Sequence, residues 1–251
     1  MSIPQRRLLI RVYGDSLSLP RHSTGIEYHD TYPERLREEI ERCQAPRVSV
    51  YNRSLGGATI SDLYAQYLRD SAYFGGKTEQ WIIIQCGVVD CAPRPVSMPV
   101  RKLISRLPVP LKWLAIKLIH HSRPFLLRFG CSFRATSLPH FESIFSAWLK
   151  HAAEHCSRVF VVNIAPTVAE VEAHSPGFTS SIVEYNLAIN RLVRNSSLIA
   201  LIDVFQAISR AGDVAACIDR SDGHHLTLAG HRLYATLVAS QAVARKNSCL
   251  W

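Results

Sequence analysis

Residues 8–18, LLIRVYGDSLS, combine a short apolar run with an abrupt turn. Residues 8–13 have the length and β-rich composition of a buried parallel strand. The run ends at Gly14, whose backbone can adopt conformations closed to other residues, so we expect a sharp turn there. The turn puts Ser16 at the carboxyl edge of the first strand, where ligand sites lie in open α/β sheets. Ser16 is therefore a candidate nucleophile if a base can reach it.

A candidate base lies far downstream, in residues 222–231, DGHHLTLAGH. His225 follows Asp222 by three residues, so one short loop can carry both an imidazole base and the carboxylate that orients it. We expect His224 and His231 to be structural or to face solvent. A metal site built from these histidines is a weaker alternative, because no carboxylate or cysteine completes a recognisable ligand spacing.

These two segments resemble the SGNH hydrolases, also called the GDSL lipase and esterase family. The family's first block is matched by residues 14–17, GDSL. Its last block, DxxH, is matched by residues 222–225, and LTLAGH continues the match at residues 226–231. The second block, an Asn followed five residues later by a Gly, is matched by Asn52 and Gly57. The resemblance extends from residue 8 to about residue 240, and it implies that Ser16, His225 and Asp222 form a catalytic triad.

The third block of the family, GxND, is met only in part by residues 87–90, GVVD. The resemblance implies three oxyanion donors, namely the backbone N–H groups of Ser16 and Gly57 and the side chain of the third-block Asn. Val89 stands in the place of that Asn and cannot donate. Loss of one such donor typically costs on the order of a hundred- to a thousand-fold in rate.

Another side chain is therefore expected to supply the missing donor. Arg94 is our first candidate, although a surface cation or an ion pair with Asp90 explains it equally well. Arg53 and Asn163 are weaker candidates. Asn52 is expected to reach the same sheet edge at the end of the second strand, close to the substrate.

Apolar runs alternate with helix signals along most of the chain. We expect further strands at residues 47–51, 80–86, 158–163 and 198–203, and helices at residues 32–40, 57–70, 140–156, 180–195 and 227–245. This alternation predicts an α/β fold with three layers, in which helices cover both faces of a five-stranded parallel sheet. The resemblance implies the flavodoxin-like topology of the SGNH hydrolases. We expect the 251 residues to form a single domain.

Residues 91–138 interrupt the alternation. They contain nine Arg and Lys residues, interleaved with Leu, Ile, Phe and Trp, and no acidic residue lies between Asp90 and Glu142. Because Pro108, Pro110 and Pro124 divide the segment, we expect two or three short amphipathic helices that form a lid beside Ser16. Such a segment suits an anionic membrane surface or a lipid-linked substrate. Packing of its apolar side on the core, with the cations in water, is the main alternative, and a dimer interface is another.

Composition limits the location and the partners. The seven cysteines form no CxxC pair and indicate free thiols in a reducing compartment. The apolar run near the N-terminus is broken by Arg11 and leads into the Ser16 turn, so we expect no export signal, and no uncharged stretch is long enough to span a membrane. We therefore expect a cytoplasmic protein, with peripheral membrane contact through residues 91–138 as an option. The net charge of +9 lies largely on an apolar-rich segment, so a nucleic-acid partner is not expected.

Together these features predict a serine esterase that needs no cofactor or metal and removes an acyl group, such as acetyl, from a glycan or a lipid-linked saccharide. The string VDCAPRP at residues 89–95 is similar to a variant block in SGNH proteins associated with bacterial surface-polysaccharide clusters. Two alternatives stay open. One is an O-acyltransferase on the same triad, because both reactions share an acyl-enzyme. The other is a catalytically weak glycan- or lipid-binding protein.

Overall fold

The computed structural model describes residues 7–43, 47–73, 79–130, 132–194 and 198–247. Its five strands are β1 (Arg7–Gly14), β2 (Arg47–Asn52), β3 (Glu79–Gln85), β4 (Arg158–Val162) and β5 (Ile199–Ile202). The α-helices of these residues are α1 (Tyr32–Cys43), α2 (Ile60–Ser71), α3 (Val88–Cys91), α4 (Met98–Ser105), α5 (Val109–Arg128), α6 (Leu138–His155), α7 (Ala169–His174), α8 (Phe178–Val193), α9 (Val204–Arg210), α10 (Val214–Cys217) and α11 (Leu228–Asn247). Short 3-10 turns lie at Ser16–Ser18, His22–Thr24 and Tyr28–Asp30.

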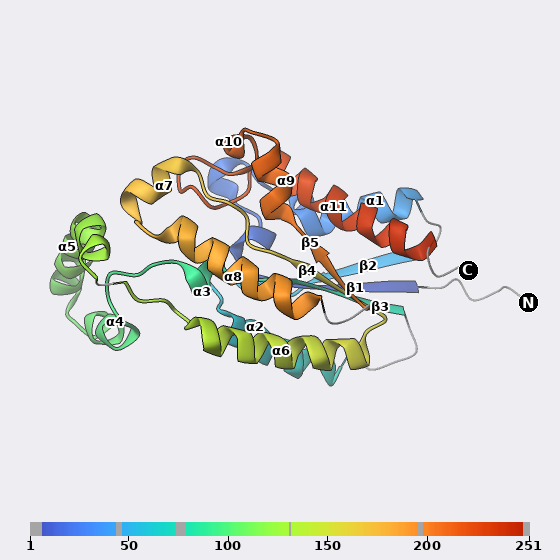
Figure 1. Ribbon diagram of the computed structural model, residues 1–251, viewed down its shortest axis with the longest axis horizontal. Coiled ribbons are helices and arrows are strands. Elements are labelled where there is room, and N and C mark those ends of the chain that lie inside the picture. Colours follow the sequence, from blue (N-terminus) through green and yellow to red (C-terminus); the bar gives the residue numbers. More distant parts are fainter. Residues whose placement is uncertain (1–6, 44–46, 74–78, 131, 195–197, 248–251) are drawn as a thin grey trace, which may run out of the picture.

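The five strands form one parallel sheet in the order β2-β1-β3-β4-β5. Helices α1 and α11 pack together on one face of the sheet, and α2, α6 and α8 cover the other (Figure 1). The predicted three-layer α/β fold is thereby confirmed, and all five predicted strands are present within two residues of their expected bounds. Since the strands are parallel, their carboxyl ends share one edge of the sheet, and this edge carries the segments that follow β1 and β3.

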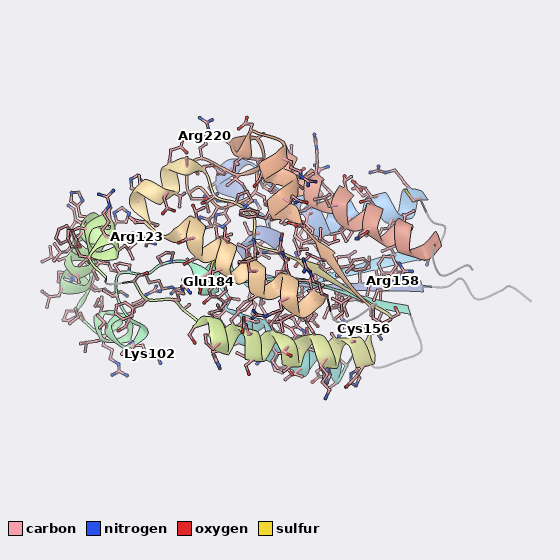
Figure 2. All side chains as sticks on the ribbon, in the orientation of Figure 1. Lys102, Arg123, Cys156, Arg158, Glu184 and Arg220 are labelled. Atoms are coloured by element: carbon pink, nitrogen blue, oxygen red, sulfur yellow. The ribbon has the colours of Figure 1, made fainter. Side chains whose placement is uncertain are left out.

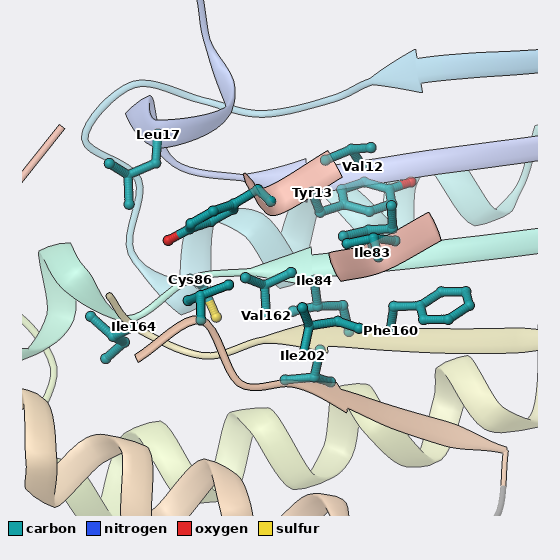
Figure 3. Packing of buried hydrophobic residues seen from close by; sticks show 14 of the residues in the cluster. Val12, Tyr13, Leu17, Ile83, Ile84, Cys86, Phe160, Val162, Ile164 and Ile202 are labelled. Atoms are coloured by element: carbon teal, nitrogen blue, oxygen red, sulfur yellow. The ribbon is translucent and has the colours of Figure 1, made fainter. Parts of the chain in front are cut away.

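The core lies on both faces of the central strands. Side chains of β1, β3 and β4 that face the helices are fully or almost fully buried, and Figure 3 shows several of them packed together: Val12, Ile83, Ile84, Phe160 and Val162. β-branched side chains pack well on a pleated surface, and strands buried on both faces favour continuous apolar runs over alternation. The run at residues 82–84 in β3, three consecutive isoleucines, fits that requirement.

Gly14 ends β1 for a different reason from the one expected. Its φ does not lie in the left-handed region, which among the described residues holds other glycines such as Gly57 and Gly87. A Cβ at position 14 would instead lie 2.1 Å from Ser18 Oγ and 2.7 Å from Gln85 Oε1. The position therefore requires glycine for space, because the turn folds back tightly against the end of β3.

The segment between α3 and α6 forms two helices that lie at one end of the molecule (Figure 1). The prediction that its prolines would cut it into short pieces is wrong for α5, which runs for 20 residues. Pro110 falls in the first turn, where a helix needs no N–H, and Pro124 costs the helix one internal hydrogen bond without ending it.

The apolar residues of α4 and α5 are mostly exposed. Leu127 is the buried residue of α5, whereas Leu103 is 63% exposed, Trp113 63% and Leu118 67%. These values do not fit the alternative in which this apolar side packs onto the core. Neither α5 nor any other helix in the described part of the chain combines the length and apolarity that crossing a bilayer requires.

Candidate active site

The turn after β1 holds Ser16 at the edge of the sheet. Asp15 is fully buried, and its Oδ1 accepts hydrogen bonds from the Leu17 N–H (3.0 Å) and from Gln85 Nε2 (3.0 Å). Ser18 Oγ donates to Gln85 Oε1 (2.7 Å), so the end of β3 is tied to both sides of the nucleophile turn. Burial is the main cause that raises the pKa of Asp15, to about 6. Asp15 thus fixes the turn from below, while Ser16 is left partly exposed.

Ser16, His225 and Asp222 lie in one hydrogen-bonded line. His225 Nε2 is 2.9 Å from Ser16 Oγ, and His225 Nδ1 is 2.8 Å from Asp222 Oδ2. Because an ionised carboxylate can only accept, Nδ1 carries the proton and Nε2 is left to accept the serine proton. The structure therefore brings the three predicted triad residues together in the geometry that a serine hydrolase requires.

The loop that carries Asp222 and His225 is fixed by its own backbone and by α7. The Asp219 N–H donates to the His225 carbonyl (2.8 Å), and the Gly223 N–H donates to the Asp219 carbonyl (2.8 Å). Gly223 has a φ of +75°, and a Cβ there would lie 1.8 Å from Val171 Cγ2. Glycine at this position therefore allows the loop to turn and α7 to pack directly against it.

The charge state of this line follows from its contacts. Burial alone would raise the pKa of Asp222, but hydrogen bonds from the N–H groups of His225 and His224, together with the charges of these two histidines, lower the pKa to about 2. Arg21 Nη1 also lies 2.5 Å from Asp222 Oδ2 and 3.0 Å from Asp219 Oδ2. Burial is the main cause that lowers the pKa of His225, and the adjacent His224 and Arg21 lower it further. Asp222 raises it, but the net shift is downward. His225 is therefore neutral, as a base must be, at neutral pH.

The other two histidines of this segment lie in different surroundings. His224 Nδ1 is 3.0 Å from the Asp222 carbonyl oxygen, and its ring lies 4.3 Å from that of His225, centre to centre. His231 is buried and accepts from the Tyr32 N–H at Nδ1 (3.2 Å), and burial lowers the pKa of His231 to about 4. Asp222, His224 and His225 lie close enough to share a cation, but Asp222 and His225 are already hydrogen-bonded to each other in the line that ends at Ser16.

A cavity of about 610 Å³ opens above Ser16. Its walls come from the turn after β1, α3 with the residues after it, the α5 helix, α7 with the start of α8, and the loop that carries Asp222. Three arginines line it, Arg94, Arg123 and Arg220. The acidic side chains of Glu170 and Asp222 line it as well, and the cavity is large enough for a sugar-sized substrate.

Solved structures with this architecture cover almost the whole chain. The lipase/acylhydrolase from Enterococcus faecalis matches with a TM-score of 0.65 and 14% identity, over 96% of this chain and 96% of that chain. A lipolytic protein of the G-D-S-L family from Veillonella parvula gives 0.61 and 13%, over 93% and 97%. An acetylxylan esterase from Geobacillus stearothermophilus gives 0.60 and 16%, over 94% and 93%.

The chain has the fold of the SGNH hydrolases. No protein-family model matches its sequence, and no curated protein matches it. The similarity is therefore one of SGNH architecture, which places the carboxyl ends of β1 and β3 and the loop before α11 at the same site.

Val89, which is predicted to take the place of the third-block Asn, lines the Ser16 cavity, and its side chain cannot donate a hydrogen bond. Arg94 lines the same cavity and donates from Nη2 to the Val89 carbonyl (3.2 Å). The carboxylate of Asp90 is buried and accepts from the Ile60 N–H and from the Thr136 hydroxyl. The structure thus puts Arg94 within the walls of the site, where its role as an oxyanion donor remains a prediction.

The remaining predicted site residues lie in different places. Gly57 is exposed, has a φ of +70° and lines a neighbouring cavity that shares walls with the first. Asn52 Nδ2 donates to the Ser18 carbonyl (2.7 Å), so its amide supports the nucleophile turn. Asn163 Nδ2 donates to Asp203 Oδ1 (2.8 Å), and Asn163 lines a separate cavity of about 410 Å³ that Ser16 does not line. Arg53 is paired with Asp70.

Some residues of the site carried no signal that sequence reasoning could use. Arg21 lies in a polar loop, and nothing in that loop indicates a contact with Asp222, about two hundred positions away. Arg123 and His120 belong to the basic segment, but their positions on α5 relative to Ser16 depend on how that helix packs. The basic composition marks the whole segment, but it does not indicate that Arg123 is the cation of α5 that lines the Ser16 cavity.

Proposed function

We propose that this chain is a serine esterase that removes an acyl group, such as acetyl, from a glycan or a lipid-linked saccharide. The observation that carries the proposal is the continuous line Ser16 Oγ–His225 Nε2–Asp222, with distances of 2.9 and 2.8 Å. The SGNH fold, which is also that of an acetylxylan esterase, supports it.

The reaction follows from the geometry. Ser16 Oγ attacks the ester carbonyl carbon while His225 Nε2 takes the hydroxyl proton, and Asp222 stabilises the imidazolium. The carbonyl π pair moves to the oxyanion, which the N–H groups of Ser16 and Gly57 and the guanidinium of Arg94 are proposed to bind. Collapse expels the alcohol, which takes the proton from His225, and leaves an acyl-serine. Water, deprotonated by His225, then attacks the acyl carbon. The bond between Ser16 Oγ and the acyl carbon breaks, Oγ recovers the proton from His225, and the acid leaves.

The substrate class is tested by comparing acetylated saccharides with neutral activated esters. Wild-type protein should release acetate from at least one acetylated saccharide, and Ser16→Ala should lose that activity by three orders of magnitude or more, on the order expected for loss of a triad nucleophile. An added sugar acceptor should not divert the acyl group if the chain is a hydrolase. Acyl transfer to the acceptor in preference to water would instead assign an O-acyltransferase.

We also propose that the chain works in the cytoplasm at an anionic membrane surface, which it contacts through α4 and α5. Exposed apolar side chains of this size rarely gather on a protein surface without a partner. Cations accompany them on the same helices, namely Arg101, Lys102, Lys112, Lys117 and Arg128, and Arg106 follows the end of α4. Each cation near an anionic lipid surface contributes about 1 kcal/mol, so several would hold the protein there reversibly.

Co-sedimentation with vesicles tests the membrane contact. Wild-type protein should pellet with phosphatidylglycerol vesicles, less so with added salt, and little with phosphatidylcholine alone. The double variant Lys117→Glu with Arg128→Glu should lose binding. The matched control, Arg42→Glu with Arg210→Glu on the body of the protein, should bind as wild type does. Equal recovery of the wild type and the first variant in the supernatant would remove this part of the proposal.

A further inference from the structure

A second cavity, of about 670 Å³, lies between the α4–α5 pair and the residues that follow α3. Arg94, His120 and Arg123 line both this cavity and the one above Ser16, so the two are neighbours. Gly57, the proposed second oxyanion donor, also lines it. A molecule that occupies the second cavity can therefore extend to the nucleophile.

Cationic side chains from three segments converge on the second cavity: Arg94 after α3, Arg101 in α4, and Lys112 and Arg123 in α5. Among the described residues, no Asp or Glu lines it. Arg101 and Lys112 are exposed, whereas Arg94 and Arg123 are partly buried. The charge of the cavity is thus strongly positive and lacks an acidic group within its walls.

Arg123 is held in place by neutral acceptors. Its Nε donates to Ser175 Oγ (2.9 Å) and its Nη2 to the Pro93 carbonyl (2.8 Å). These bonds fix the guanidinium, which Figure 2 shows on α5 on the side toward α7, without neutralising it. Burial, and then the charge of Arg101, lowers the pKa of both Arg94 and Arg123, as expected for cations held close together. Such mutual repulsion is relieved when an anion binds among the cations.

We propose that the second cavity binds a phosphate group on the alcohol side of the ester substrate. The inference rests on the proposed esterase function and narrows its substrate to phosphate-bearing acylated saccharides, free or lipid-linked. Guanidinium groups match phosphate oxygens in pairs, and cations from three directions suit a tetrahedral dianion better than a planar carboxylate. The volume exceeds that of phosphate alone and leaves room for a sugar or the first part of a lipid against Ile104, Ile116 and Ile119.

Two matched substrates test the proposal in the whole protein: an O-acetylated glucose phosphate and the O-acetylated methyl glucoside. Wild type should prefer the phosphate in kcat/KM by about ten-fold or more, the factor that 1.4 kcal/mol supplies. The preference should shrink with added salt. It should fall toward one in the double variant Arg101→Gln with Lys112→Gln.

The control variant removes the same charge from the same helical segment but outside the cavity. Lys102→Gln with Arg106→Gln should keep the preference, since neither side chain lines the cavity and Lys102 points away from the body (Figure 2). Loss of the preference in both double variants would mean that the net charge of the segment, not the cavity, attracts phosphate. That result would overturn the inference.

The test separates failure of the inference from failure of the proposed function. If the neutral ester is hydrolysed as well as its phosphate analogue, the esterase stands and the phosphate site is refuted. If no ester is hydrolysed, calorimetry on the same protein still judges the site, because glucose phosphate should bind and methyl glucoside should not. Farnesyl phosphate in micelles distinguishes the sources, since tighter binding than that of glucose phosphate indicates a lipid-linked substrate. Absence of binding by both phosphates would refute the site.

Discussion

Replacement of Asp222 by Asn tests the orientation of the base without removing volume. Oδ1 of Asp222 accepts from two backbone N–H groups, those of His224 (3.1 Å) and His225 (3.0 Å). Oδ2 faces His225 Nδ1 (2.8 Å) and Arg21 Nη1 (2.5 Å). An asparagine has one oxygen and one NH₂ group, so it can satisfy only one of these two sides.

In the Asp222→Asn variant, the backbone N–H groups of residues 224 and 225 determine the orientation of the side-chain amide. Backbone N–H groups cannot become acceptors, whereas His225 can change its tautomer and Arg21 can keep its second partner, Asp219. In the Asp222→Asn variant the amide oxygen is therefore expected at the Oδ1 position, with the NH₂ group facing His225 Nδ1. That arrangement removes the proton from Nδ1 and places it on Nε2, which can then no longer accept the proton of Ser16.

The wrong tautomer costs on the order of 10⁴ in kcat in serine hydrolases, which is about 5.5 kcal/mol. We expect a loss of this size for Asp222→Asn with a chromogenic acetyl ester at neutral pH. The control Asp219→Asn changes a carboxylate that also faces Arg21 but makes no hydrogen bond with the His225 imidazole, and its backbone bond to the His225 carbonyl is kept. It should cost less than about ten-fold. A loss below about ten-fold in Asp222→Asn, in protein shown to be folded by circular dichroism, would refute this argument.

Four further predictions concern the same site. His225→Ala should abolish ester hydrolysis and His224→Ala should retain most of it; the reverse result would move the base by one residue. Arg94→Ala should lower kcat about ten-fold or more if its guanidinium binds the oxyanion, and unchanged kcat would leave only the backbone donors. His225 must be neutral to act, and its pKa is lowered. The acid limb of the pH profile of kcat/KM should therefore lie below about 6.5, the ordinary pKa of histidine. Arg21→Gln removes a cation that lowers this pKa and should move the limb to higher pH, whereas no shift would show that Arg21 acts on position alone.

The parts of the fold that sequence predicted are those fixed by local pattern. The apolar runs of β1 and β3 specify buried strands, and Asp222 and His225 converge because three positions on one loop suffice. The order of the GDSL and DxxH segments then brings Ser16 to His225, since both segments end at the same edge of a parallel sheet.

Features that depend on packing between distant segments were not predictable. Gly14 was expected for its backbone conformation, but the space next to Ser18 and Gln85 is what requires glycine. Pro124 lies inside a continuous helix, although a proline within a helical segment predicts a break. The contact of Arg21 with Asp222 joins two polar loops, and the spacing of apolar residues in a sequence does not predict contacts between loops.

The central claim, that Ser16 is a nucleophile activated by His225, is tested most directly by labelling with a fluorophosphonate probe. The probe forms a covalent bond only with an activated serine, and peptide mass spectrometry identifies the labelled residue. Wild type should carry one label, on Ser16, formed more slowly as pH falls through the pKa of His225, and His225→Ala should not be labelled. Absence of labelling in folded wild-type protein, or a label on another serine, would contradict the account.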